Sequence, residues 1–412
     1  MTRAEQALAR LCDALGPEAV LAGGPPAGDG AAPAPTLRPA DPLALARAVA
    51  LLHELRLAAL VRGGGTRLSL GNPLRRTDVV LSTLGLEGVR DFDPGEGVCR
   101  VGAGTLLSRL RAQVNAGGWE LPLDAPRRGS TVGGTLAAAA IGPRAQGFGA
   151  PRDQVLGLEV VLGDGLLTKC GGRVVKNVTG YDLAKLYTGS LGTLGVIAAA
   201  WLRLRPLPER VAWLEAAPAS TETACARGLA AARRPTTRAA AVLLPAGGPA
   251  RLVVELAGPA AAVDCDADGL AGEGDFRAAS ADALDRARRL QADPPRAGGL
   301  RFRLWLRPSR IAAVAERIAA AGGTCLLYPG LGQAWACFEP GAPASQDAAF
   351  AAVASAAALG GGGHCLEAGP AEARAGRDAF GDAAALVPLT RALKARFDPA
   401  GVLNPGRALG GT

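Results

Sequence analysis

The pattern of apolar and polar positions predicts a helix followed by short strands in the first quarter of the chain. Ala58–Val61, Val79–Ser82 and Val98–Val101 are apolar runs bounded by turn residues, which is typical of buried strands. Ahead of the first run, Asp41 and Pro42 supply a helix cap and a favourable first helical residue. We therefore expect a helix to lead into the first strand.

Similar patterns continue to about residue 208. Thr105 is placed to cap a helix that ends at Gly117, and Gly163-Asp164-Gly165 joins two apolar runs as a hairpin. Asp182–Tyr187 fits a short helix, and Gly195–Leu204 alternates like a strand until prolines stop it.

From about residue 216 the composition shifts to alanine and arginine. Short apolar runs such as Phe302–Leu306 and Ala334–Phe338 alternate with helical patterns such as Ile311–Ala321, which predicts a compact α+β domain. The chain closes with an amphipathic helix that Asp398-Pro399 stops, followed by a tight turn at Asn404-Pro405-Gly406.

Composition narrows the class of protein. A chain of 412 residues is long enough for two or three domains, and its apolar runs fall short of the roughly 20 residues of a membrane span. The first residues lack the layout of a secretory signal, so we expect a soluble, cytoplasmic protein. The eight cysteines have no C-x-x-C spacing, which excludes an iron–sulfur cluster and predicts no metal site.

The net charge of +8 raises the question of an anionic partner. Aromatic residues make up only 4% and the arginines are spread along the chain, so we discount nucleic acid. Anionic small molecules and an acidic partner surface fit the charge equally well.

Two glycine-rich segments are candidates for ligand binding. In Arg62–Thr66, RGGGT, successive backbone N–H groups can turn inward and bind an anion, although glycine is 57 of 412 residues and the triple is weak evidence by itself. In Ser130–Ala140, small residues would let a flat ligand approach the backbone, or would form a buried alanine-rich helix.

A third segment, Gly171–Ile197, concentrates three of the four lysines of the chain in or beside it, together with two of its three tyrosines. This concentration is either a fluctuation of composition or a sign that particular side chains are needed there. Lys176 and Asn177 are better interpreted as structural residues, or as neighbours of a ligand, than as an acid or base.

In their order along the chain, five motifs resemble the vanillyl-alcohol-oxidase (PCMH-type) flavoproteins, and most of all the FAD-binding E subunit of bacterial glycolate oxidase. The motifs are RGGGTR, GSTVGGTLAAAAIGPR, FGAPRDQVLGLEVVLGDG, GGRVVKNVTGYDLAKLYTGSLGTLGVI and FDPAGVLNPGR. The resemblance covers about residues 58–208 and 386–410. It implies an α+β fold with a two-subdomain FAD-binding domain, a smaller cap-like α+β domain and a C-terminal tail that returns to the first domain. The expected division is 1–40 (helix and linker), 41–215, 216–385 and 386–412.

The resemblance also implies which residues bind FAD. Residues 62–66 would bind the pyrophosphate, residues 126–134 the flavin and its phosphates, and residues 195–197 a ring edge, while Arg407 would help the tail to cover the site. The full set is Arg62, Gly63, Gly64, Gly65, Thr66, Arg67, Pro126, Gly129, Ser130, Thr131, Gly133, Gly134, Phe148, Gly149, Arg152, Asp153, Gly195, Val196, Ile197 and Asn404.

The departures from the family pattern bear on activity. The hydroxy-acid dehydrogenases of this family carry a paired-histidine motif in the second domain, whereas this chain has only His53 and His364. No histidine lies near the flavin motifs, so FAD is expected to be bound non-covalently. Gly189-Ser190-Leu191-Gly192 also lacks the carboxylate of the GSEG pattern in catalytic relatives, and no catalytic residue is assigned.

The resemblance therefore implies a subunit that binds FAD within a multi-subunit oxidase of glycolate or a similar 2-hydroxy acid. Its partners would be a larger FAD-containing subunit and an iron–sulfur subunit, and the complex could bring the cytoplasmic chain to the inner membrane. Two alternatives stay open, namely a self-sufficient FAD-dependent dehydrogenase and an assembly subunit that holds no FAD.

Overall fold

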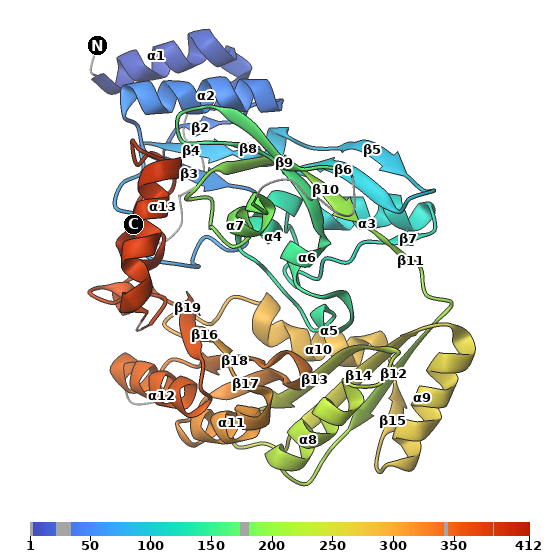
Figure 1. Cartoon of the computed structure of the whole chain (residues 1–412). Helices are drawn as coiled ribbons and strands as arrows, with labels where there is room; N and C mark the ends of the chain where they lie inside the picture. Colours follow the sequence, from blue (N-terminus) through green and yellow to red (C-terminus); the bar gives the residue numbers. More distant parts are fainter. Residues whose placement is uncertain (1–2, 22–33, 174–180, 342–344, 382) are drawn as a thin grey trace.

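Two domains follow each other in the computed structural model, which describes residues 3–21, 34–173, 181–341, 345–381 and 383–412 (Figure 1). In the described ranges the first domain carries two main sheets, and the second carries one larger sheet with helices packed on it. The C-terminal helix runs back beside the first domain. This mixed architecture confirms the fold class predicted from the sequence.

A small, mainly parallel sheet begins the first domain. Its strand order is β1-β2-β4-β3, and β2, β4 and β3 run parallel. Apolar residues of α2 and of these strands form one core, because short buried strands need a helix over one face. The elements are α1 (Arg3–Leu15), β1 (Val20–Leu21), β2 (Thr36–Leu37), α2 (Pro42–Leu55), β3 (Ala59–Arg62) and β4 (Val79–Ser82).

Asp41 caps α2, as the sequence predicted. Its Oδ1 accepts hydrogen bonds from the backbone N–H groups of Leu43 and Ala44, both at 2.8 Å. Replacing Asp41 with alanine is expected to lower the free energy of unfolding by about 1 kcal/mol, because two N–H groups of the first turn lose their acceptor. Urea unfolding followed by circular dichroism measures the change. Asp13→Ala, at an exposed position inside α1, is the control, and an equal loss there would contradict the capping role.

The second sheet of this domain is antiparallel, with strand order β5-β6-β10-β8-β9. The hairpin of β8 and β9 and the short helix α7 lie where the sequence predicted them. The elements are β5 (Val89–Asp93), β6 (Val98–Gly102), α3 (Leu107–Ala116), β7 (Trp119–Glu120), α4 (Val132–Ala137), α5 (Ala145–Phe148), α6 (Pro151–Gln154), β8 (Val155–Val161), β9 (Leu167–Gly171), α7 (Leu183–Tyr187), β10 (Val196–Arg203) and β11 (Arg205–Pro206), the last of which pairs with β7.

The predicted cap at Thr105 is wrong. Helix α3 begins only at Leu107, and the Thr105 hydroxyl instead accepts a hydrogen bond from the backbone N–H of Gly88 at 2.9 Å. The Thr105 side chain is buried. Its hydroxyl is the acceptor for a backbone N–H group of a turn that the fold brings against it, and not for one of the helix that follows in the sequence.

The second domain is an antiparallel sheet of order β15-β12-β14-β13-β17-β18-β16-β19. Helices α8, α9, α11 and α12 share one core with the sheet, while α10 packs on the opposite side together with Ile141 and Ala145 of the first domain. The elements are β12 (Arg210–Ala216), α8 (Thr221–Ala231), β13 (Thr237–Leu244), β14 (Arg251–Gly258), α9 (Ala260–Gly272), β15 (Arg277–Ala279), α10 (Ala281–Ala292), β16 (Leu300–Trp305), α11 (Ile311–Ala320), β17 (Thr324–Tyr328), β18 (Gln333–Phe338), α12 (Gln346–Leu359) and β19 (Gly363–Ala368).

The chain crosses between the domains in residues 207–209, because β11 pairs within the first domain and β12 belongs to the second. After β19 the chain returns through α13 (Val387–Phe397), and Leu403 pairs in parallel with Ala59 of β3. No helix in the described ranges is long and apolar enough to cross a membrane.

Candidate functional site

The first glycine-rich segment forms a loop directly after β3, and we call residues 62–67 the cradle loop. A β-carbon at Gly64 would overlap the carbonyl oxygen of Gly129, and one at Gly63 would overlap the hydroxyl of Thr131. The glycines therefore let this loop lie directly against the loop that leads into α4.

That second loop holds the cradle loop through polar contacts. The Ser130 and Thr66 hydroxyl oxygens lie 3.4 Å apart, and the Arg127 guanidinium donates to the carbonyl oxygen of Thr66. Thr131 accepts a hydrogen bond from Gly134 N–H at 3.2 Å and so caps α4. Two segments 64 residues apart in the sequence are thereby joined at one place.

The C-terminal tail contacts the same place from the other side. The Asn404 side chain accepts from the Val61 N–H at 2.8 Å and donates to the Leu191 carbonyl oxygen at 2.7 Å. Arg407 donates through Nη1 to the carbonyl oxygens of Leu68 and Leu70, at 2.5 and 3.0 Å. Asn404 lies beside the cradle loop, with its amide bound to the protein backbone on both sides.

These three segments line an open cavity of about 80 Å³, which we call the cradle cavity. The backbone N–H groups of Gly63, Gly64, Gly65 and Thr66 donate to no acceptor within the described part of the chain. Such a run of free donors is suited to an anion. The lining residues are Val61, Arg62, Gly63, Gly64, Gly65, Thr66, Arg67, Leu68, Thr131, Gly134, Ala137, Ala138, Leu191, Asn404 and Arg407.

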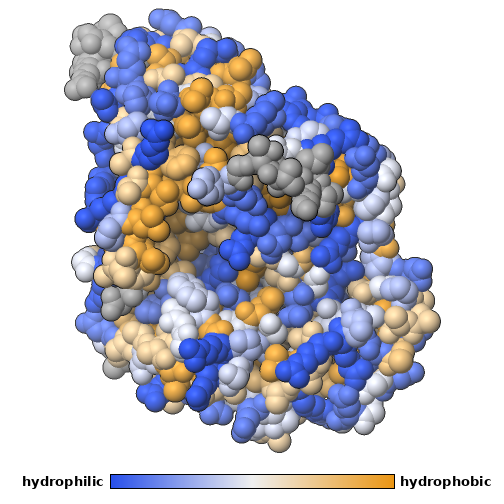
Figure 2. Space-filling view, viewed as in Figure 1, coloured by the Kyte–Doolittle hydropathy of each residue, from blue (hydrophilic) through white to orange (hydrophobic). Residues whose placement is uncertain are grey.

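A larger cavity of about 390 Å³, the junction cavity, lies between the two domains. Ala139, just after the end of α4, lines it from the first domain. Its lining residues from the second domain are Arg303, Leu331 and Gln333. Arg303 donates to the carbonyl oxygen of Ala139 at 3.4 Å. The surface is hollowed between the domains on the face shown in Figure 2. Among the described residues, neither the cradle cavity nor the junction cavity is lined by His, Asp or Glu.

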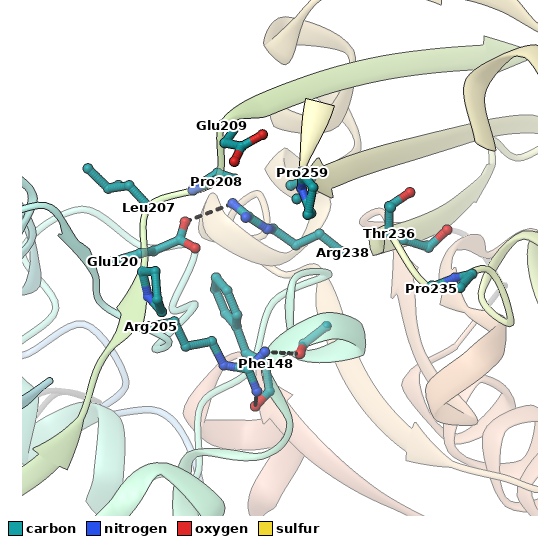
Figure 3. A pocket seen from close by; sticks show the side chains of 15 residues that line it. Glu120, Phe148, Arg205, Leu207, Pro208, Glu209, Pro235, Thr236, Arg238 and Pro259 are labelled. Atoms are coloured by element: carbon teal, nitrogen blue, oxygen red, sulfur yellow. Dashed lines mark hydrogen bonds and ion pairs between the residues drawn. The ribbon is translucent and has the colours of Figure 1, made fainter. Parts of the chain in front are cut away.

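A third cavity, of about 410 Å³, lies where the chain crosses between the domains (Figure 3). The ring of Phe148 has the guanidinium carbons of Arg238 and Arg205 at 5.4 and 5.7 Å from its centroid. Glu120 accepts from Arg238 Nη1 at 2.7 Å. Burial raises the pKa of Glu120, and Arg238 opposes that shift. With Glu209 also lining it, the cavity has two carboxylates and two guanidinium groups among its described lining residues.

The structure brings part of the expected FAD set together. Residues 62–67 line the cradle cavity together with Thr131, Gly134 and Asn404, and Gly129 and Ser130 lie in the adjoining loop. Gly149 and Arg152 line the junction cavity instead, while Phe148 lines the third cavity.

The remaining expected residues line none of these three cavities. Gly133 packs on Ala103, and Asp153 accepts a hydrogen bond from Ala150 N–H at 3.1 Å. Val196 and Ile197 are buried in the cores of the first domain, and Gly195 lies against Val160. Pro126 is half-buried in the loop before Arg127. Lys176 and Asn177 lie outside the described residues.

Some lining residues were not predicted. Leu191 lines the cradle cavity and Arg303 lines the junction cavity. Ala137 and Ala138, which also line the cradle cavity, belong to the segment Ser130–Ala140 that was expected to approach a ligand. Leu191 has a φ of 56°, in the left-handed region, and stands between glycines in GSLG, so a turn beside the site could have been inferred for it. For Arg303, the alternation of apolar and polar residues along β16 gives no indication that the residue lies at a cavity.

The two histidines of the chain lie away from these cavities. His53 Nδ1 lies 3.2 Å from the carbonyl oxygen of Gly163, and His364 is on β19, where burial lowers its pKa. In the described ranges, no group of three or more His, Cys, Asp or Glu is placed to hold a metal ion.

Comparison with known sequences assigns the first domain. Residues 33–171 match the sequence model of the FAD binding domain family. Mitochondrial D-2-hydroxyglutarate dehydrogenase of Bos taurus is 39% identical over 176 residues, which are 42% of this chain and 32% of that protein. Glycolate oxidase subunit GlcE of Escherichia coli is 36% identical over 151 residues (36% and 43%), and D-lactate dehydrogenase of Archaeoglobus fulgidus is 39% identical over 155 residues (37% and 34%).

The chain thus spans less than half the length of these three relatives. Over nearly the whole chain, the fold is similar to that of alkyldihydroxyacetonephosphate synthase, with a TM-score of 0.69 at 14% identity, covering 97% of this chain and 84% of the other. Residues 33–171 therefore match the FAD binding domain family, and the fold of the chain, second domain included, is similar to that of this synthase.

The cradle fits the anionic part of FAD. Arg67 and residues 63–66, whose backbone N–H groups have no acceptor in the described part of the chain, line the cradle cavity, and no carboxylate of the described residues lines it. The volume of the cradle cavity suits a phosphate group. Ala138 lines the cradle cavity and the next residue, Ala139, lines the wider junction cavity. When bound, FAD would supply the ring that accepts a hydride, and the residues of the cradle cavity would bind and orient it.

Proposed function

We propose that this chain is the FAD-binding subunit of a multi-subunit oxidase that converts glycolate or a similar 2-hydroxy acid to the 2-oxo acid. The observation that carries the proposal is an anion cradle in a segment that matches the FAD binding domain family, with no His, Asp or Glu among the described residues that line the cradle cavity and the junction cavity. Oxidation of a hydroxyl group requires a base beside it, so a partner subunit has to supply that base. The relative GlcE, itself named a glycolate oxidase subunit, supports this assignment.

The same observations support non-covalent binding of FAD. Neither histidine lines the cavities, and covalent attachment through an imidazole therefore has no residue to use. Iron–sulfur clusters would belong to another subunit, since the cysteines of this chain are scattered.

A second candidate is a self-sufficient FAD-dependent 2-hydroxy-acid dehydrogenase. It is favoured by the 39% identity of the matched segments to D-2-hydroxyglutarate and D-lactate dehydrogenases. In that case an arginine or another residue of this chain would have to do the work of the base.

Flavin reduction of the purified chain separates the two candidates. We expect FAD to be released by denaturation in a ratio near one per chain, and to stay oxidised when glycolate or D-lactate is added without oxygen. Adding the partner subunits co-purified with the tagged chain should then restore reduction. Complete bleaching of the isolated chain would establish the self-sufficient dehydrogenase, and a colourless chain that cannot take up FAD would overturn both candidates.

A further inference from the structure

A chain of buried charges links the cradle loop to the second domain. Arg67 follows Thr66 directly, and its Nη1 donates to Glu367 Oε1 of β19 at 3.1 Å. The other oxygen of Glu367 accepts from Arg301 Nε at 2.9 Å. The three side chains are at most 8% exposed. One carboxylate is therefore shared by two guanidinium groups, one from each domain.

This array carries more positive than negative charge. Burial lowers the pKa of Arg67, Glu367 opposes that shift, and Arg303 and Arg301 add to it. Nη2 of Arg67 and Nη2 of Arg301 are buried without a hydrogen-bond partner among the described residues. An unpaired buried charge is unfavourable, so the array is electrostatically incomplete without a further anion.

Arg67 also lines the cradle cavity, together with residues 63–66, whose backbone N–H groups have no acceptor within the described residues. A group with several acceptor oxygens, such as a pyrophosphate, would satisfy the backbone donors and the free edge of the guanidinium together. Glu367 leaves that edge free because it binds Arg67 through Nη1. Its backbone carbonyl oxygen also accepts from the Ser69 hydroxyl at 3.1 Å, which fixes β19 against the same loop.

We propose that Glu367 is a positioning residue that couples the packing of the second domain to the binding of an anion at the cradle. Glu367 orients Arg67 toward a pyrophosphate-class anion. That anion balances the excess positive charge of the array and so stabilises the contact of β19 with the first domain. This inference rests on the proposed function only in taking the anion to be part of FAD. Since coupling is reciprocal, the anion strengthens domain docking by the factor by which docking strengthens anion binding.

The test uses the full chain stripped of flavin, with FAD and inorganic pyrophosphate as probes in titration calorimetry and thermal unfolding. Arg67→Gln is expected to weaken the binding of each probe about tenfold, because a charge-assisted hydrogen bond is lost. Glu367→Gln is expected to weaken binding to a smaller extent, and the double variant should match Arg67→Gln alone. Arg67→Lys, which keeps the charge but not the planar fork, should fall between wild type and Arg67→Gln.

Arg100→Gln is the matched control. Arg100 forms an ion pair with Glu159 at 2.7 Å inside the first domain, with Glu159 only 7% exposed. Its loss should lower the unfolding temperature of the free protein without changing the rise that pyrophosphate produces. In Glu367→Gln that rise itself should shrink, which a merely structural role would not cause.

Three results would overturn the inference: unchanged or tighter pyrophosphate binding in Glu367→Gln, additive effects of the two substitutions, or no pyrophosphate binding by the wild type. The outcomes also separate this inference from the proposed function. Binding of pyrophosphate with the coupling but without uptake of FAD would refute only the flavin assignment. Binding of FAD without the coupling would refute only the role of Glu367.

Discussion

Replacing Lys394 with methionine is expected to lower the free energy of unfolding by about 3–5 kcal/mol, because it leaves a buried carboxylate without its cation. Lys394 Nζ donates to Asp398 Oδ2 at 2.6 Å, to the Thr193 carbonyl oxygen at 2.9 Å and to the Leu403 carbonyl oxygen at 2.5 Å. Burial lowers the pKa of Lys394, and Asp398 opposes that shift. The ammonium group thus links Thr193 of the first domain to Leu403 of the tail, the residue that precedes Asn404.

Denaturant unfolding of the full chain measures this effect, and flavin content measures its consequence at the cradle. Lys185→Met is the matched control, because Lys185 is 55% exposed and pairs with Asp182 at 3.2 Å on the surface. That change should alter stability by less than about 1 kcal/mol. Equal effects of the two substitutions would show that the tail contact contributes little.

Asp124→Asn is the second change with a large expected effect, again about 3–5 kcal/mol of stability at neutral pH. Asp124 is buried in the first domain, where it accepts from Arg144 N–H at 2.8 Å and from the guanidinium of Arg288 on α10. The amide leaves Arg288 without its buried carboxylate partner, so that only the exposed carboxylate of Asp285 remains beside it. Asp285→Asn is the matched control, because Asp285 pairs with the same Arg288 but is 63% exposed.

The effect of Asp124→Asn should depend on pH in a definite direction. Burial alone would raise the pKa of Asp124, but Arg288 and Arg144 together hold it below its usual value of 3.8. The stability that the charged form contributes is therefore complete above that value and is lost as the pH falls through the lower pKa of the folded state. Urea unfolding at neutral and acidic pH should show the difference between wild type and variant shrinking in acid. A difference that stays constant or grows would contradict the assignment.

Both predictions include a contact between segments that are far apart in the sequence: Lys394 contacts Thr193, 201 residues away, and Asp124 contacts Arg288, 164 residues away. Such contacts were the least predictable part of the protein. Asp41 was identified as a cap because the backbone N–H groups that donate to it lie two and three residues away. Thr105 was assigned wrongly because its partner lies 17 residues earlier, in a turn that only the folded sheet brings near. Phe148, one of the residues expected to bind FAD, lies in the cavity at the domain crossing, where the guanidinium groups of Arg205 and Arg238 lie near its ring (Figure 3).

By itself, the sequence determined the local elements and the order of the motifs, because strand alternation, helix caps and glycine turns depend on neighbours within a few residues. It therefore determined the α+β fold class and the cradle loop after β3. Tertiary structure decided which segments meet there. Arg67 and Glu367 are 300 residues apart, and the cavity is closed by a tail 343 residues beyond Val61. The burial and the charge balance at these long-range contacts arise only when the chain has folded, so no local sequence pattern could predict them.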